Sequence, residues 1–396
     1  MKKLLFALSL VSLTFTSCTK DDTTGDEGIT PATGTISGDI TGNVNYAYGN
    51  YNLSGVVRVK NGATLTIAAG SVITIDKTVS IDNALIVEQG GKINLIGTSS
   101  SPIVFTEVSK TPGSWSGIML VGKAPIIAAG GSTTANSEDG SNISYGGTDA
   151  TDNSGNLSYV RVEYAGKKVA DGLKETNGFT FYSVGSGTTL DHLVSYKGAD
   201  DGYEFFGGTV SMTNAISYGN FDDAFDWQDG WRGANNSNWT GIQVGKGNFG
   251  MEIECSSNNN TFYPTVSGVT LKRVSGCVPE VIGDVQVDAF QFKKEGNGFF
   301  DNVIIDGYGS YTEGSTTYQG AAVKIQDATT NTNQVNTSKI KLTNAKISNT
   351  SQSTWVGAGS VVVTIPSGQF TTSTTATGSV LLNGAWSTVD NVSLLQ

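Results

Sequence analysis

Short stretches in which apolar and polar residues alternate dominate the chain, and one such stretch recurs. Residues 201–205 (Asp-Gly-Tyr-Glu-Phe) return 22 residues later as residues 223–227 (Asp-Ala-Phe-Asp-Trp). Each copy begins with a small residue and then alternates apolar, polar and apolar, which is the period of a strand with one buried face. Looser copies lie at residues 177–181, 250–253, 289–292 and 322–325.

A second series of strands accompanies the first, at residues 160–164, 192–196, 214–218, 270–274 and 302–305. Nearer the N-terminus, short strands are separated by Asn-Gly or Gly-Gly turns. Two or three strands in a repeat of about 22 residues suit one coil of a parallel β-helix, because each strand then lies over its counterpart at about 4.8 Å. We therefore predict an all-β fold, a right-handed single-stranded parallel β-helix over residues 41–396. A β-sandwich or propeller would also give many short strands, but not one motif at one coil length.

The N-terminus has the features of an export signal. Lys2 and Lys3 precede an apolar run over residues 4–15, and Phe15-Thr16-Ser17-Cys18 is a cleavage site with small residues before the cysteine. The run is shorter than the roughly 20 residues that a membrane-spanning helix needs. We predict a lipoprotein signal peptide over residues 1–17, with Cys18 lipidated and anchoring the protein to a membrane.

Residues 19–27 are polar and acidic, without apolar periodicity. Such a stretch buries little apolar surface, so a flexible linker is expected over residues 18–40. An acidic run directly after the lipidated cysteine resembles the surface-export signal of Bacteroidota lipoproteins. That resemblance implies the outer face of the outer membrane.

Composition limits the partners. The formal net charge is -11, which repels phosphate backbones, so no nucleic-acid binding is expected. Polyanions in general are disfavoured unless a cation bridges them. The chain has 51 glycines and seven prolines, as suits an all-β fold. Cys255 and Cys277 could form a disulfide in an oxidising compartment, or could be two separate buried thiols.

Four segments resemble a family of β-helical surface lipoproteins of Bacteroidota. They are residues 62–70 (Gly-Ala-Thr-Leu-Thr-Ile-Ala-Ala-Gly), 113–117 (Gly-Ser-Trp-Ser-Gly), 159–166 (Tyr-Val-Arg-Val-Glu-Tyr-Ala-Gly) and 200–208 (Asp-Asp-Gly-Tyr-Glu-Phe-Phe-Gly-Gly). The resemblance covers most of residues 50–310. It implies the fold and the location, and it assigns no activity and no catalytic residue.

The candidate site comes from the alignment of the repeats, which places one polar residue of each copy in a single outward-facing column. Like charges opposed on neighbouring strands are destabilising, so three successive carboxylates call for water, a cation or a function. The column contains Thr180, Glu204, Asp226, Glu252, Gln291 and Lys324. The acidic residues that flank it are Asp200, Asp201, Asp222, Asp223, Asp229 and Glu254.

Three interpretations of these carboxylates remain open. Paired aspartates on adjacent coils could supply the six to eight oxygens that Ca²⁺ prefers, and we predict Asp200, Asp201, Asp222, Asp223 and Asp229 as its ligands. Two carboxylates one or two coils apart also satisfy the spacing of a glycosidase. The third alternative is a solvated acidic face whose aspartates cap turns.

Aromatic residues gather beside the column. Trp227 occupies an inward position and should be core, whereas Trp231 and Trp239 follow in a stretch rich in Gly and Asn. Exposed indoles beside carboxylates could stack on sugar rings, so Trp231 and Trp239 join Glu204, Asp226 and Glu252 as predicted ligand-binding residues. The alternative is that both indoles fold over the end of a strand.

The single histidine, His192, aligns with Asn214 one repeat later, at the entrance to a strand, and is predicted to be structural. Histidine-rich zinc sites and HExxH peptidases are therefore not supported. A polysaccharide lyase would need a lysine or arginine base beside Ca²⁺, and the sequence singles out none. We expect a surface-exposed outer-membrane lipoprotein that binds a glycan or another extracellular ligand. The alternatives are a carbohydrate-active enzyme, either a glycosidase or a Ca²⁺-dependent lyase, and a structural subunit of an outer-membrane complex.

Overall fold

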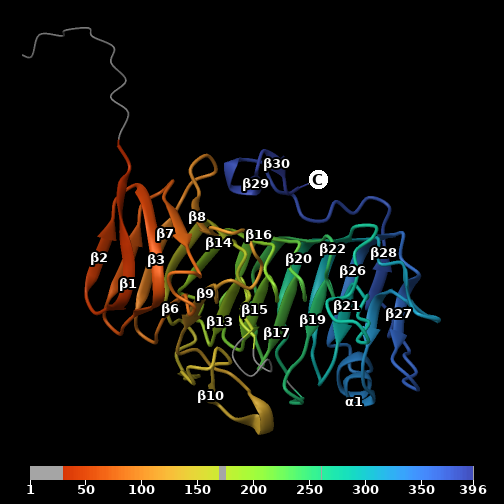
Figure 1. The fold of residues 1–396 in the computed structure, drawn as a ribbon. Helices are drawn as coiled ribbons and strands as arrows, with labels where there is room; N and C mark the ends of the chain where they lie inside the picture. Colours follow the sequence, from red (N-terminus) through yellow and green to blue (C-terminus); the bar gives the residue numbers. More distant parts are fainter. Residues whose placement is uncertain (1–29, 169–174, 260, 396) are drawn as a thin grey trace, which may run out of the picture. The chain divides into compact units, whose positions relative to one another are not determined.

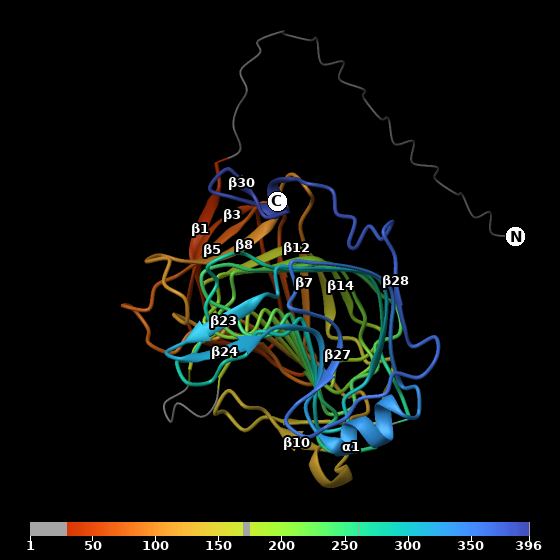
Figure 2. The ribbon, with the colours of Figure 1, turned by 90° about the vertical axis from the view of Figure 1, so that its right-hand side faces the viewer.

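The computed structural model describes residues 30–168, 175–259 and 261–395. Within residues 31–396, which form one compact unit, 24 strands join into one continuous system of parallel ladders. The strands stack side by side from β1 and β2 at one end to β27 and β28 at the other (Figure 1), and the view along the stack shows the chain coiling around a common interior (Figure 2). The predicted parallel β-helix is confirmed.

One face of the coils, called the ladder face below, carries the repeated motif. In the N-terminal coils it is formed by the second half of β3 (Gly49–Val59), β6 (Ala84–Val87) and β9 (Ile118–Val121). It continues through β13 (Phe179–Tyr182), β15 (Tyr203–Phe206), β17 (Phe225–Gln228), β19 (Met251–Ile253), β21 (Phe290–Phe292), β25 (Ala321–Ile325) and β27 (Gln352–Gly357).

The remaining faces consist of separate short strands in the N-terminal coils and of long bent strands thereafter. In the N-terminal coils these strands are the nine-residue β1 (Ala32–Ile40) and the short strands β2 (Asn43–Tyr46), β4 (Thr64–Ile67), β5 (Val72–Ile75), β7 (Lys92–Ile96) and β8 (Ile103–Glu107). The long strands are β12 (Gly155–Glu163), β14 (Thr189–Tyr196), β16 (Met212–Tyr218), β18 (Asn236–Gln243), β20 (Thr265–Arg273), β22 (Gly298–Asp306) and β26 (Ile340–Ser348), followed by the short β28 (Phe370–Thr372).

Each long strand bends at one residue in the left-handed backbone region. Asn214 has a φ of 56° and Asn238 a φ of 57°, and the register places these bends in one column with His192 and Asn302. Asparagine tolerates this conformation, and its side chain can bond the next coil. The Asn238 amide donates to Asn214 at 3.0 Å. The predicted structural role of His192 therefore agrees with its position in this bend column.

The interior is filled by two inward columns of the ladder face together with the inward residues of the other faces. Phe179, Tyr203 and Phe225 stack over one another, with ring centroids 5.3 and 5.4 Å apart. Trp227 lies in the parallel column and is 1% exposed, as predicted. Stacked apolar columns supply the burial that no single coil can achieve alone.

The insertions between coils place further elements outside the stack. The first insertion carries η1 (Ala129–Gly131), β10 (Ala135–Asn136) and β11 (Ser144–Tyr145), and it projects beside the ladder face (Figure 1). Near the C-terminal end are the hairpin of β23 (Ser310–Glu313) and β24 (Thr316–Gln319), and the short helical turns α1 (Ala328–Thr330) and η2 (Asn331–Val335).

The first strand begins earlier than predicted. β1 spans Ala32–Ile40 and pairs in parallel with β3, and Ile36 is fully buried. These nine residues fall within the segment expected to be a flexible linker. The β-helix therefore begins at β1 rather than at residue 41, because Ile36 and Ile40 of this strand are buried in the core. The predicted signal peptide and Cys18 lie outside the described residues.

The C-terminal segment, residues 376–395, returns along the stack and binds the bend column. Asn302 Oδ1 accepts the backbone N–H of Thr377 at 2.8 Å, and Asn238 Oδ1 accepts that of Val380 at 3.1 Å. The segment then forms η3 (Ala385–Ser387), β29 (Thr388–Val389) and β30 (Val392–Ser393), which lie beside β14 and β16 (Figure 1). Trp386 packs against His192.

None of the helices in the described ranges is long and apolar enough to cross a membrane.

The bend column gives a stability prediction. Asn214→Ala should lower the free energy of unfolding by about 1–2 kcal/mol, because alanine is strained at this φ and loses the bond to Asp191 as well as that from Asn238. Asn214→Gly keeps the conformation and should lose less. Urea unfolding of the purified variants measures both. Equal losses for alanine and glycine would show that the backbone conformation contributes nothing.

Candidate functional site

The predicted acidic column exists. Glu204 pairs with Asp226 across β15 and β17, and Asp226 pairs with Glu252 across β17 and β19. Thr180 lies one coil before, and Gln291 and Lys324 continue the column beyond. We call Glu204, Asp226 and Glu252 the acidic ladder. Their side chains point away from the aromatic interior, because the inward positions alternate with theirs along each strand.

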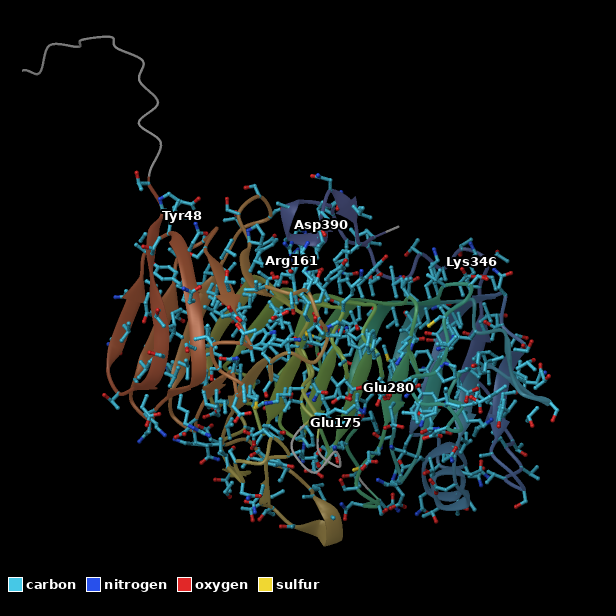
Figure 3. The ribbon with its side chains drawn as sticks, viewed as in Figure 1. Tyr48, Arg161, Glu175, Glu280, Lys346 and Asp390 are labelled. Atoms are coloured by element: carbon cyan, nitrogen blue, oxygen red, sulfur yellow. The ribbon has the colours of Figure 1, made fainter. Side chains whose placement is uncertain are left out.

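The acidic ladder is not the solvated face that one interpretation expected. Glu204 is only 8% exposed and Asp226 only 7%, because segments outside the coils cover the ladder face on two sides. On one side is the insertion of β10 and β11, where the backbone N–H of Glu138 donates to the Tyr182 hydroxyl at 3.1 Å. On the other side, Lys168 binds both Glu175 and Glu280, which lie close together in Figure 3.

Two of the flanking aspartates connect successive coils. Asp201 Oδ1 accepts the backbone N–H of Asp223 at 2.8 Å, and Asp223 Oδ1 accepts that of Phe249 at 2.7 Å. In the same way, Asp288 Oδ1 accepts the backbone N–H of Ala321 at 2.7 Å. Each bond uses one carboxylate oxygen at the start of a strand. The aspartate that precedes the small residue and the inward aromatic residue of each motif therefore has a structural role, and its second oxygen remains for another role.

Among the residues that the structure describes, carboxylate oxygens converge in four overlapping groups of three, each with its atoms within 4.8 Å of one another. Two groups share Asp201: one adds Glu204 and Asp226, and the other adds Asp222 and Asp223. A third joins Asp223, Asp226 and Glu252, and the last joins Glu175, Asp200 and Asp222. Hard carboxylate oxygens at this density are the donor set that Ca²⁺ prefers.

Hydrogen bonds satisfy part of the acidic ladder. Glu204 accepts the Asn177 amide at 2.6 Å and the Gln228 amide at 2.9 Å. Asp226 Oδ1 is buried and has no hydrogen-bond partner, although an unpartnered buried carboxylate oxygen is costly. The acceptor without a donor thus belongs to a residue that takes part in two of the carboxylate groups.

One lysine contacts the acidic ladder directly. Lys293 Nζ lies 2.6 Å from Glu252 and 3.5 Å from Glu254, and Lys294 lies 2.8 Å from Glu254. Burial lowers the pKa of Lys293, but the charges of Glu252 and Asp226 outweigh it, so this pKa is raised above its usual value. Lys293 is therefore an ammonium cation that neutralises one end of the ladder.

The remaining carboxylates are too close to be ionised together without a further cation. Burial, followed by the charge of Glu280, raises the pKa of Asp222 to about 7. Burial and the charges of Glu204 and Glu252 raise the pKa of Asp226 well above its usual value. These shifts belong to one interacting set, in which every added negative charge opposes the others.

Two predicted sugar-stacking residues are core residues instead. Trp231 is 1% exposed and Trp239 is fully buried. Their indole N–H groups donate to the carbonyls of Val210 and Met212 at 3.0 and 2.9 Å, and both rings stack on Phe205. The prediction of ligand-binding indoles is therefore wrong. The chain folds both of them into the interior between β15 and β18, where their ring area is better buried.

Asp229 also differs from the prediction. It belongs to none of the four carboxylate groups found among the described residues; Tyr145 donates to its Oδ2 at 2.6 Å and Ser256 donates to its Oδ1 at 2.5 Å. With Glu254 and Lys294, it lines a hollow of about 420 Å³ beside the ladder. Asp229 therefore fixes the β10–β11 insertion to the coil rather than joining a cluster of carboxylates.

Several residues at the site were not predicted from the sequence. Glu175 and Glu280 lie in loops whose lengths differ from coil to coil, where no repeat marks them, whereas Asn177 begins a copy of the motif, at the position that Asp201 occupies one coil later. Lys293 directly follows a copy of the motif, which was a further available signal. Cys255 and Cys277 are both buried as thiols and do not bridge each other, which decides between the two alternatives left open.

Comparison with known proteins identifies the domain type. A family model described as a pectate-lyase-like beta helix domain matches residues 37–388. No curated protein matches the chain significantly, and no solved structure does so.

The raised pKa of Asp222 predicts the pH dependence of stability. The folded protein holds this proton up to about pH 7, whereas the unfolded chain releases it near pH 4. The free energy of unfolding in excess EDTA should therefore fall as pH rises from 4 to 7. Asp222→Asn should remove part of that fall and raise the melting temperature at pH 8 by about 2 °C or more.

The matched control is Asp284→Asn, which changes an exposed aspartate and should leave the profile as it is. Thermal melts at pH 5 and pH 8 compare the three proteins. A wild-type profile that rises from pH 5 to pH 8 in EDTA would contradict the assignment.

Proposed function

Because the chain belongs to the family of pectate-lyase-like β-helix domains, we propose that it binds an extracellular glycan at the ladder face, with Ca²⁺ held by the acidic ladder and its flanking aspartates. The single observation that carries the proposal is that buried Asp226, whose Oδ1 has no hydrogen-bond partner, belongs to two groups of three carboxylates whose oxygens lie within 4.8 Å of one another. We further propose that the protein is a lipoprotein anchored through Cys18 on the surface of the outer membrane.

The charges support a divalent cation rather than a second lysine. Lys293 offsets one negative charge near Glu252 and Glu254, while Glu204, Asp226 and Asp201 form a group with no salt bridge among the described residues. A single doubly charged ion would offset the charges of two carboxylates. It would bind the oxygens of Asp226 and Asp223 that accept no hydrogen bond from the protein. Asp200, Asp222 and Glu175 offer a second such position at the edge of the face.

The proposal of a glycan as the ligand rests on the oxygen ligands that Ca²⁺ prefers. Bound Ca²⁺ supplies a cationic centre that accepts hydroxyl and carboxylate oxygens of sugars as ligands. Without it, a face this acidic repels an anionic polysaccharide. Gln228, which borders the ladder and is only half-buried, carries an amide group suited to bonding sugar hydroxyls. The proposed binding is therefore dependent on Ca²⁺ and is strongest for acidic sugars.

A Ca²⁺-dependent lyase is the second candidate, and the position of Lys293 favours it. A lyase needs a basic residue beside the ion, and Lys293 contacts Glu252 at 2.6 Å. Its raised pKa holds the ammonium form in the absence of the ion, and an ammonium cannot accept a proton. Binding without turnover is therefore the function that we propose first.

The Ca²⁺ site is tested by thermal melting. Adding CaCl₂ to the EDTA-treated protein should raise the melting temperature, since an ion that binds only the folded state stabilises it. Asp226→Asn should abolish this rise and should itself be at least as stable as wild type in EDTA, because it removes a buried acid whose ionisation burial and the neighbouring carboxylates oppose. Asp284→Asn should respond like wild type. Identical melting temperatures of wild type in EDTA and in excess Ca²⁺ would refute the site.

The glycan is tested on an array of acidic and neutral polysaccharides. Retention of acidic glycans should be greater in Ca²⁺ than in EDTA, and Asp226→Asn should lose that increment while Asp284→Asn keeps it. Absence of any Ca²⁺-dependent increment across the array would contradict the proposed function.

The lyase alternative is tested on the glycans that bind, by the ultraviolet absorbance of unsaturated uronates. We expect none. If product forms and is lost in Lys293→Ala but retained in the exposed-lysine control Lys346→Ala, the protein is a lyase and our first candidate is wrong.

A further inference from the structure

The C-terminal segment (residues 376–395) docks on the single histidine of the chain. The ring of His192 stacks on Tyr159 of β12, with centroids 4.1 Å apart and an interplanar angle of 18°. Trp386 of the C-terminal segment lies across the imidazole, with centroids 4.9 Å apart and an interplanar angle of 78°. The imidazole is thus in contact with a strand of the coils and with the segment that returns over them.

Side-chain packing, rather than pairing with the strands of the coils, holds this segment in place. In the described ranges β29 and β30 pair only with each other. Trp386 is nevertheless only 1% exposed, because it packs with Val389 and Leu394 against an apolar cluster separate from the interior of the coils. The coil residues of that cluster are Tyr164, Val194, Tyr196 and Ile216. A segment held in this way can open locally while the coils stay folded.

One carboxylate lies beside His192. Asp191 Oδ2 is 2.7 Å from Nδ1 of the imidazole, and Asp191 Oδ1 accepts the Thr213 hydroxyl at 2.7 Å and the Asn214 amide at 2.8 Å. Burial raises the pKa of Asp191, but these three hydrogen bonds outweigh it, so this pKa lies below its usual value. Asp191 is therefore a carboxylate at neutral pH, and a protonated imidazole would form an ion pair with it.

The other charged side chains around this contact are paired with one another. Arg161 of β12 lies 2.6 Å from Glu163. Asp390, which is the one ionisable side chain of residues 376–395, lies 3.0 Å from Lys110. The charge of Asp191 is therefore the one that remains to be offset by His192.

A hollow of about 260 Å³ gives water access to the imidazole. His192 and Trp386 line it together with Ser99 of the loop at residues 98–101 and with Asn214 of β16, and neither that loop nor Asn214 brings an ionisable side chain. The side chain of His192 is 21% exposed. A proton can therefore reach the ring while the segment is docked, and hydration limits the cost of burying the charge.

We propose that His192, Asp191, Tyr159 and Trp386 form a proton-sensitive latch, in which protonation of the imidazole holds the C-terminal segment against the coils and loss of the proton loosens it. Histidine ordinarily changes its charge between about pH 5 and pH 8. Asp191 and Tyr159 favour the charged ring whether or not the segment is docked, whereas the cation–π contact with Trp386 exists only in the docked state.

The direction of the effect follows from that difference. The docked state binds the proton more tightly than the open state, so docking becomes stronger as pH falls and weaker as pH rises. Opening exposes the apolar cluster around Val194 and Ile216. The latch goes beyond the proposed function, because it lies on other strands than the acidic ladder and involves none of the carboxylates of the ladder.

Hydrogen–deuterium exchange with mass spectrometry on the full chain tests the latch, after correction for the intrinsic pH dependence of amide exchange. Protection of residues 376–395 should be about fivefold greater at pH 5.5 than at pH 8. His192→Asn should reduce this ratio to about one. Asparagine suits the backbone here, since Asn214 and Asn238 occupy the same bend position at φ 56° and 57°, against 51° for His192.

Two control variants should keep the fivefold ratio. Asp390→Asn removes the other ionisable side chain of the segment, and Asp222→Asn changes the acidic site on the ladder face, so the second variant separates the latch from the proposed function. Peptides from β20 report any change in the stability of the coils themselves. The proposal is overturned if the wild-type segment is protected equally at both pH values or more strongly at pH 8. It is also overturned if His192→Asn, with a melting temperature at pH 8 close to that of wild type, keeps the ratio.

Discussion

Parallel, in-register stacking of short strands is the constraint on which the rest of this protein depends. Each strand lies about 4.8 Å above its counterpart, so a residue type that recurs in the sequence becomes a continuous column in space. Aromatic residues at the inward positions become a stacked core, as with Phe179, Tyr203 and Phe225. Asparagines at the bends become a ladder of side-chain amides. Carboxylates on the outward position become neighbours that repel each other.

The same geometry explains why the acidic ladder needs support from outside the coils. Stacking brings Glu204, Asp226 and Glu252 together. It offers no hydrogen-bond donor between them, because the backbone N–H groups of the strands bond the carbonyls of neighbouring strands. Donors therefore come from residues outside the strands. The Asn177 amide donates to Glu204, and the Lys293 ammonium pairs with Glu252. Asp226, in the middle, receives neither. The position with the least help from the protein is thus the position at which a bound cation would contribute most.

Sequence periodicity was sufficient to predict the fold and the outward column residue by residue, since both follow from a local pattern repeated at one register. Periodicity failed where coils differ in length. Met251 pairs with Phe290, 39 residues away, whereas Tyr203 pairs with Phe225, 22 residues away. Residues in the connections between coils, among them Glu175 and Glu280, have no counterpart in other coils. Trp231 and Trp239 were misjudged for a related reason: a stretch rich in Gly and Asn indicates a surface loop, but here it leads into β18, whose inward face holds Trp239.

The C-terminal segment changes how the stack can come apart. A solenoid whose coils contact only their neighbours can lose them one at a time from either end. Here residues 376–395 bind side chains of three separate coils through Asn302, Thr270 and Asn238, and Arg161 then donates to the carbonyls of Ala385 and Thr388 near Asp390 (Figure 3). The last residues of the chain thus fasten coils formed some 200 residues earlier. Opening of the middle of the stack requires release of this segment first, so a protease or a mechanical load that acts on the middle coils must displace the C-terminal segment before the strands beneath it can separate.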